Sequence, residues 1–172
     1  MLDNVDFANI SKSSPYGFCG FITVSALRQS DCREVPDEPG VYLVLWPWKD
    51  TDPKFLEPGI GGYFKGKNPN VCKDELENHW VKGTRVVYIG KAGGVTGKAT
   101  LKSRLRQYVK FGCGRRISHW GGRYIWQLAN ADQLQVCWRK SVPHETPREI
   151  ERALTQEFKG RYCKLPFANL QL

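Results

Sequence analysis

The heptapeptide GVYLVLW at positions 40–46 constrains the fold more than any other part of the chain. Its residues after the glycine are β-branched, aliphatic or aromatic, and Pro39 and Pro47 bound it, so it predicts a largely buried strand. A second strand is predicted over 85–89 (RVVYI), where Gly90 closes it, and a third over 134–139 (LQVCWR), where apolar and polar residues alternate. Strands of this kind need cover, so we expect a sheet enclosed by helices.

Two longer helices are indicated by their apolar spacing and end signals. In the first, apolar residues recur at i, i+4, i+7 and i+8: Leu101, Leu105, Tyr108 and Val109. The second has Thr146 and Glu149 as a T-x-x-E capping box with Pro147 at the first helical position, and Gly160 is expected to end it. A short helix is predicted over 74–81. The predicted fold class is therefore α+β, a small and mainly antiparallel sheet of about three core strands flanked by helices.

The remaining segments carry weaker signals. Residues 1–39 form an N-terminal lead-in, in which 21–27 suits a strand edge or a short helix. Residues 47–84 are rich in Gly, Pro, Lys and Asn and are expected to be an insertion between two strands. The stretch 112–122 is expected to be a glycine-rich loop and 123–128 to be extended. With 172 residues, the whole of 1–172 is expected to form one domain.

Composition excludes several classes of protein. No window approaches the roughly 18 apolar residues of a membrane span, and the first ten residues include Asp3 and Asp6 instead of a signal pattern. We therefore expect a cytoplasmic protein without membrane contacts. The six cysteines include no CxxC pair, which argues against a zinc ribbon and favours reduced thiols.

The net charge of +9 is concentrated in one segment. Residues 88–131 contain no Asp or Glu but nine Lys and Arg, and the other 17 Lys and Arg equal the 17 Asp and Glu of the whole chain. Like charges without acidic partners repel one another unless a polyanion lies nearby, and nucleic acid is the expected polyanion. Seven of the nine, with His119, are the predicted nucleic-acid contacts: Lys98, Lys102, Arg106, Lys110, Arg115, Arg116, His119 and Arg123.

Five short motifs occur in a characteristic order along the chain. They are Gly40-Val41-Tyr42, Tyr88-Ile89-Gly90, the helical run from Leu101 through Arg104 to Tyr108, Glu151-Arg152-Ala153-Leu154, and Pro166-Phe167-Ala168-Asn169. Each falls on the type of element expected for it. Together they resemble the ordered signature of the GIY-YIG nucleases over residues 40–169.

The resemblance implies a hydrolase that cleaves phosphodiester bonds of DNA with one Mg²⁺ (or Mn²⁺) per site. It implies that Glu151 binds the metal, that Arg104 contacts the scissile phosphate and that Asn169 steadies the site. The other catalytic residues that it implies are the two motif tyrosines, the lysine after the second motif and the tyrosine one turn beyond the arginine: Tyr42, Tyr88, Lys91 and Tyr108. DNA is the expected substrate, and RNA stays open.

These residue types suit phosphoryl transfer, which requires positioning and neutralisation of charge on phosphate oxygens. A tyrosine with a pKa near 10 is a poor base at neutral pH, and lowering that pKa by about three units takes roughly 4 kcal/mol. A cation about 4 Å from the phenol oxygen would supply a free energy of this size, and Lys91 is the candidate. We expect Tyr42 to deprotonate water and Tyr88 to bind phosphate or water, although the pattern leaves the two roles interchangeable.

Structural alternatives accompany these assignments. Tyr42 and Tyr88 also suit a strand core, and Glu151 also suits a surface pair with Arg148 or Arg152. The stretch 119–123 fits a phosphate and base contact and fits a packed glycine turn about equally, whereas Trp46, Trp48, Trp126 and Trp138 are expected to fill the core. The 45-residue connection between the two tyrosine motifs is longer than the family's usual hairpin. It is also the expected place for a homodimer contact or a protein partner, or for a longer DNA footprint through Lys65, Lys67 and Lys73. The functional alternatives are a non-catalytic nucleic-acid-binding module and a partner-dependent subunit of a restriction, repair or defence assembly.

Overall fold

The computed structural model describes residues 4–48, 51–94, 98–117 and 119–171. Strands and helices alternate irregularly along the chain. Their order is β1 (Cys19–Thr23), α1 (Val24–Gln29), β2 (Gly40–Leu45), α2 (Lys73–His79), β3 (Val86–Ala92), α3 (Leu101–Gly112), the 3₁₀ helices η1 (Trp120–Gln127) and η2 (Ala131–Gln133), β4 (Gln135–Lys140) and α4 (Pro147–Tyr162).

Within the described residues, one antiparallel sheet has the strand order β1-β4-β2-β3. The predicted α+β class with an antiparallel sheet is confirmed. The sheet has four strands instead of three, because residues 21–27 supply both predicted alternatives, with β1 ending at Thr23 and α1 beginning at Val24. The strand β3 is an edge of the sheet, and the two central strands are β2 and β4.

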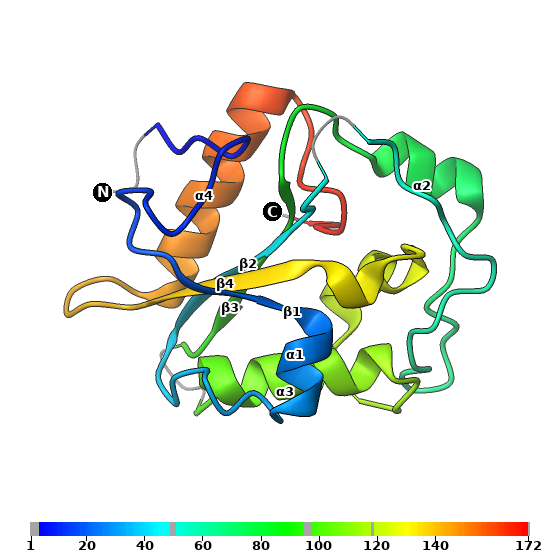
Figure 1. The fold of residues 1–172 in the computed structure, drawn as a ribbon, viewed down its shortest axis with the longest axis horizontal. Helices are drawn as coiled ribbons and strands as arrows, with labels where there is room; N and C mark the ends of the chain where they lie inside the picture. Colours follow the sequence, from blue (N-terminus) through cyan, green and yellow to red (C-terminus); the bar gives the residue numbers. More distant parts are fainter. Residues whose placement is uncertain (1–3, 49–50, 95–97, 118, 172) are drawn as a thin grey trace.

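The alternation of side chains along β2 divides the core into two parts. Val41, Leu43 and Leu45 point toward α4 and the N-terminal segment, whereas Tyr42 and Val44 point toward α1 and α3. Figure 1 shows α4 on one side of the sheet and α1 with α3 on the other. The sequence of β2 lacks polar positions because both of its faces are covered.

The N-terminal capping box of α4 is confirmed, since the Thr146 side chain accepts from the Glu149 amide and the Glu149 carboxylate accepts from Thr146. The helix runs through Gly160 and ends at Tyr162. Cys163 then adopts φ 56° and closes the helix in the left-handed region. A glycine inside a helix costs only about 1 kcal/mol, so packing on either side carries the helix past it.

The segment 47–84 is built into the core. Leu76 of α2 is fully buried, and five more side chains pack partly buried against the same cluster as Tyr42: Trp48, Phe55, Phe64, Val71 and Trp80. The N-terminal lead-in likewise contributes Val5, Phe7 and Ile10 to the cluster under α4. The segment 47–84 and the N-terminal lead-in, which the sequence suggested were peripheral, therefore each complete one of the two parts of the core.

The expectation of an extended segment over 123–128 is wrong. Residues 123–127 belong to η1, and only Leu128 is extended, in a bridge to Phe55. Tyr124, Ile125 and Trp126 are all buried. Consecutive buried residues are compatible with a covered strand and with a tight helical turn alike, and here the chain turns tightly against α3. Trp46, Trp126 and Trp138 are buried and Trp48 packs partly buried on the core, as expected.

None of the helices in the described ranges has the length and apolar character required to cross a lipid bilayer. All six cysteines carry free thiols, and two of them, Cys32 and Cys137, are buried.

Candidate active site

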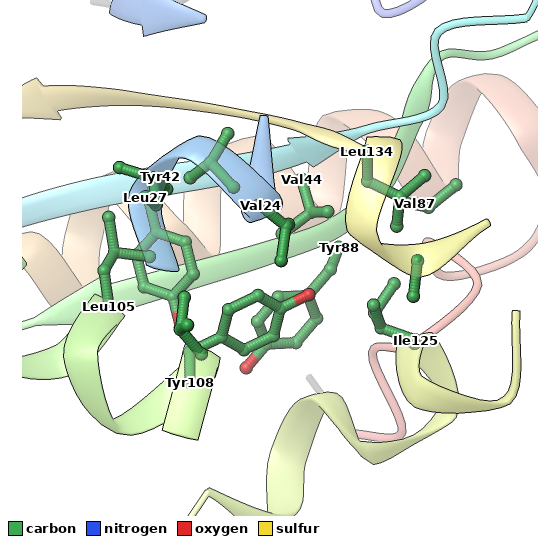
Figure 2. Close-up of a cluster of buried hydrophobic side chains, with 14 of the residues drawn as sticks. Val24, Leu27, Tyr42, Val44, Val87, Tyr88, Leu105, Tyr108, Ile125 and Leu134 are labelled. Atoms are coloured by element: carbon green, nitrogen blue, oxygen red, sulfur yellow. The ribbon is translucent and has the colours of Figure 1, made fainter. Parts of the chain in front are cut away.

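The three tyrosines predicted for the site meet beneath the sheet. Tyr42 and Tyr88 come from β2 and β3, and Tyr108 comes from α3, which covers this face. The ring centroid of Tyr42 lies 6.0 Å from that of Tyr88 and 6.4 Å from that of Tyr108. Figure 2 shows the three rings between the sheet and α3. In the antiparallel register Tyr42 pairs with Gly90 and Tyr88 pairs with Val44, so the two strand tyrosines are diagonal neighbours on one face.

Gly90 gives the ring of Tyr42 its place. A Cβ atom at position 90 would lie 2.4 Å from Tyr42 Cζ and 2.6 Å from its hydroxyl oxygen. Real Cβ atoms do not approach so closely, so only glycine fits opposite this tyrosine. The glycine of the second motif is thus explained by the tyrosine of the first.

His119 completes the buried cluster. It is 1% exposed, and its Nε2 lies 3.1 Å from the hydroxyl oxygen of Tyr42. Burial lowers the pKa of His119 to about 3, and the nearby Arg104 guanidinium lowers it further, so the imidazole is neutral at pH 7. The predicted nucleic-acid contact by His119 is therefore corrected, because this side chain lies behind the tyrosines instead of on the surface.

Burial also keeps the phenols protonated. It raises the pKa of Tyr88 to about 12; Arg104 opposes this rise, Glu151 adds to it, and a hydrogen bond from Tyr42 opposes it. Burial likewise raises the pKa of Tyr42 well above 10. The cation that favours ionisation of both phenols is Arg104, where the sequence had suggested Lys91.

A cavity of about 1050 Å³ opens at the β3 edge of the sheet, where side chains from both faces meet. Tyr88 reaches it from the tyrosine face, whereas Lys91 of β3 and Glu151 of α4 reach it from the other face. Tyr42 and Tyr108 are fully buried, so Tyr88, at 7% exposed, is the tyrosine in contact with the cavity. Deprotonation of water by Tyr42 stays a prediction, and it places that role on a side chain with no exposed surface.

Lys91 and Glu151 form an ion pair on the cavity wall. The side chain of Glu151 is 21% exposed and that of Lys91 38%. The predicted surface alternative of Glu151 pairing with Arg148 or Arg152 is not found in the described part of the chain. Instead, Arg148 and Arg152 line the same cavity.

Asn169 fastens the C-terminal segment to the open edge of β3. Its amide nitrogen donates to the carbonyl of Ile89 at 2.8 Å, and its amide oxygen accepts from the Ile89 N–H at 2.9 Å. One residue earlier, the Ala168 N–H donates to the carbonyl of Val87. The side chain therefore supports the backbone between Tyr88 and Gly90, which agrees with the steadying role expected for it.

Arg104 lies on α3 and is partly buried. Its positive charge lies near Tyr42, Tyr88 and His119 and acts on the pKa of each. Its Nη1 also donates to the side chain of Gln107 at 3.3 Å. Tyr88, Lys91, Glu151 and Asn169 thus line the cavity at the β3 edge, whereas Tyr42 and Tyr108 lie buried behind Tyr88, with Arg104 near them.

The predicted nucleic-acid contacts lie in different settings. Lys98, Lys110, Arg115 and Arg116 are exposed, and Lys102 is partly so. Arg106 forms a salt bridge to Asp31 at 2.8 Å and is tied to the end of α1.

Arg123 lines the cavity between two aromatic rings. Its guanidinium carbon lies 4.6 Å from the centre of the Trp120 ring and 5.0 Å from that of Tyr124. Trp120 lines the cavity too. Trp120 and Arg123 line the cavity, whereas His119 packs inside, and a phosphate or base contact by 119–123 stays a prediction.

Sequence reasoning missed several cavity residues on α4. Arg148 and Thr155 stand three residues before and four residues after Glu151, on the same side of the helix, and Arg152 and Gln156 adjoin them. The helical i, i+3 and i+4 rule applied to Glu151 would have found Arg148 and Thr155.

No family model, no curated protein and no solved structure matches this chain.

The donor set bears on what the site can hold. No group of three or more His, Cys, Asp or Glu side chains that suits a metal ion occurs among the described residues. A caged, dehydrated metal ion is therefore not supported there. One carboxylate on an open cavity wall does fit Mg²⁺, which keeps several waters and binds through one or two carboxylates plus phosphate oxygens.

Proposed function

We propose that this chain is a metal-dependent endonuclease that hydrolyses phosphodiester bonds of DNA in the manner of the GIY-YIG nucleases. The observation that carries the proposal is the cavity at the β3 edge, where a carboxylate, a phenol and several cations from separate segments face one another. Tyr88 and Lys91 lie on opposite faces of the edge strand β3, and Glu151 lies on α4, so strand packing alone does not require the three side chains to meet.

The charge of the cavity favours a polyanion. Four cationic side chains line it, Lys91, Arg123, Arg148 and Arg152, against the carboxylate of Glu151. Since Lys91 and Glu151 pair with each other, three arginines remain to bind phosphate groups, for which the planar guanidinium is well suited. The cavity is also larger than most small-molecule pockets, which suits a polymer that passes through it.

Glu151 would hold the metal, which would displace the ammonium group of Lys91 from the carboxylate. When bound, the ion would supply neutralising charge to the phosphate oxygens and to an attacking water. Lys91 would then be free to turn to the substrate. The proposal thus gives the Lys91–Glu151 pair a role in the metal-free protein, where it satisfies both charges.

Tyr88 is the residue we assign to the attacking water. Tyr42 donates a hydrogen bond toward it, and a hydrogen bond from His119 Nε2 to the Tyr42 oxygen would complete a chain ending at Tyr88. Such a chain, together with Arg104, stabilises negative charge on the Tyr88 oxygen. Tyr42 is a positioning residue in this scheme because it has no access to the cavity.

Replacing the metal-binding carboxylate tests the proposal. We expect Glu151→Gln to abolish Mg²⁺-dependent nicking of supercoiled plasmid while duplex binding stays within about threefold, since the other cavity cations remain. Glu77→Gln on α2, which removes a carboxylate paired only with Lys73 at the surface, should cleave normally. Cleavage by Glu151→Gln would refute the metal assignment. Binding without any cleavage by the unmodified chain would favour the non-catalytic alternative.

The two tyrosines should differ in a second measurement. Tyr88→Phe removes the phenol on the cavity wall and should lower kcat by about 10² to 10⁴, the usual contribution of a general base. Tyr42→Phe keeps Tyr88 in place and should cost about tenfold, the effect of one lost hydrogen bond. The reverse order of the two losses in single-turnover cleavage would return the role to Tyr42.

A further inference from the structure

We propose that the loop 59–67 of the segment between β2 and β3 forms, with the C-terminal end of α3, a second DNA-contacting surface that binds duplex flanking the cleaved bond. This inference rests on the proposed function, because it names where the substrate extends beyond the cavity. It gives the long connection between the two tyrosine strands a role in substrate binding. We call this surface, made of residues 59–67, 110, 115 and 116, the flanking surface.

The loop is docked firmly on the end of α3. The Gly62 N–H donates to the carbonyl of Phe111 at 2.9 Å, and the Ile60 N–H donates to the carbonyl of Trp126 at 2.9 Å. A Cβ atom at position 62 would lie 2.0 Å from the carbonyl oxygen of Arg115, so only glycine permits this contact. The loop and the basic turn after α3 therefore form one continuous surface.

The flanking surface combines positive charge with exposed aromatic area. Lys65 and Lys67 are exposed, and backbone hydrogen bonds between Phe64 and Lys67 close the tight turn that presents them. Tyr63 beside them is 48% exposed and Ile60 is 43% exposed. Three large hydrophobic side chains are exposed in the described part of the chain, and two of them, Ile60 and Tyr63, lie in this loop.

Acidic side chains are missing from both parts of the flanking surface. The sequence has no Asp or Glu over 58–73 or over 88–131. Five cations are thus gathered there without neighbouring carboxylates in either segment: Lys65, Lys67, Lys110, Arg115 and Arg116. A solvated protein face normally mixes both signs, whereas single-sign clusters with exposed aromatics favour phosphate and base contacts.

The flanking surface continues from the helix that carries Arg104. Lys110 follows Arg104 by six residues on α3, which is about 9 Å along the helix axis. Six helical positions turn the two side chains to different sides of α3, so Lys110 and Arg104 would contact different phosphates. Lys65 and Lys67, on the loop that Gly62 joins to Phe111, would extend the contact beyond α3.

Salt dependence of binding tests this inference. The probe is a fluorescent 40-base-pair duplex titrated without Mg²⁺ into the Glu151→Gln protein, at several NaCl concentrations. Adding Lys65→Gln and Lys67→Gln should lower the slope of log K against log salt by about 1.8, because each lost phosphate contact removes about 0.9. The matched control, Lys12→Gln with Lys82→Gln, removes the same charge from exposed positions elsewhere and should leave the slope unchanged. Tyr63→Ala should weaken binding about fivefold at an unchanged slope.

Each outcome separates the flanking surface from the catalytic proposal. Equal slopes for the two double variants, with Mg²⁺-dependent cleavage retained by the unmodified chain, would overturn the flanking surface alone. A reduced slope in a chain that never cleaves would support the flanking surface and refute the endonuclease. Failure of the unmodified chain to bind the duplex at low salt would overturn both.

Discussion

At the scale of single residues, the buried cluster behind the cavity contains polar atoms that lack hydrogen-bond partners. Three tyrosines and a neutral histidine lie within one apolar core, and the hydroxyl of Tyr108 and the Nδ1 atom of His119 have no hydrogen-bond partner among the described residues. Buried polar atoms without partners cost about 1–3 kcal/mol each. A core selected only for stability would avoid them, so their presence beside a cavity is consistent with a functional cluster.

Acid should destabilise the protein through His119. Its pKa is about 3 in the folded chain and 6.5 otherwise, so below pH 6.5 the unfolded chain binds a proton that the folded chain refuses. The stability that the neutral imidazole contributes is present above pH 6.5 and is lost as the pH falls toward 3. Between pH 7 and pH 4.5 this loss amounts to about 3 kcal/mol. The three tyrosines near the ring, Tyr42, Tyr88 and Tyr108, stay protonated over this range because burial raises the pKa of each.

Urea unfolding at the two pH values measures the effect. Between pH 7 and pH 4.5, the free energy of unfolding should fall by about 3 kcal/mol more in the unmodified chain than in His119→Gln. Glutamine does not titrate, and all the carboxylates are common to both proteins. Equal losses would mean that the imidazole takes up its proton without unfolding the cluster.

At the scale of the elements, local signals predicted what local physics determines. The strand β2 follows from uninterrupted apolar residues, and the start of α4 follows from its capping box and proline. The proximity of Tyr42, Tyr88 and Tyr108 agrees with the resemblance, which placed all three in one site. The 3₁₀ form of η1 and the burial of His119 depend on how the chain returns across α3, and no residue pattern within 119–128 encodes that return.

The C-terminal segment hydrogen-bonds to the open edge of β3, and the Asn169 side chain makes two of these bonds. Asn169→Ala would leave both the N–H and the C=O of Ile89 without their partner in a buried setting, at a cost of about 2–4 kcal/mol. The freed backbone carries Tyr88 on one side, so kcat should fall about tenfold or more through misplacement of the phenol.

A control variant that is destabilised away from Asn169 separates the two effects. Thr23→Ala removes the N-cap of α1, far from the cavity, and should cost about 1 kcal/mol with kcat unchanged. If Asn169→Ala lowers stability while kcat at saturating DNA stays at the original level, Asn169 only closes the sheet edge.

At the scale of the whole molecule, the packing of segment 47–84 determines whether the protein unfolds as one cooperative unit. It interrupts the tyrosine hairpin and looks like an appendage in the sequence, yet its apolar residues share a cluster with Tyr42 and Val44. Trp80 packs edge-on against Trp46 at 5.1 Å and Phe167 at 5.2 Å, so the segment also contacts the residues next to Asn169. A segment packed in this way should unfold together with the sheet.

Gly62→Ala tests that unity because it strains the contact between the segment and α3 while leaving every strand untouched. The new Cβ would overlap the carbonyl oxygen of Arg115, and such overpacking costs about 1–3 kcal/mol. In one cooperative unit, the urea midpoints from tryptophan fluorescence and from far-ultraviolet circular dichroism should fall together. Gly160→Ala has open space and lies within a helix, so it should raise both midpoints slightly. Separate midpoints in Gly62→Ala, with the circular dichroism transition unchanged, would show that the segment unfolds by itself. The loop 59–67 would then move independently of α3, and its lysines would contact DNA without a fixed distance from Arg104.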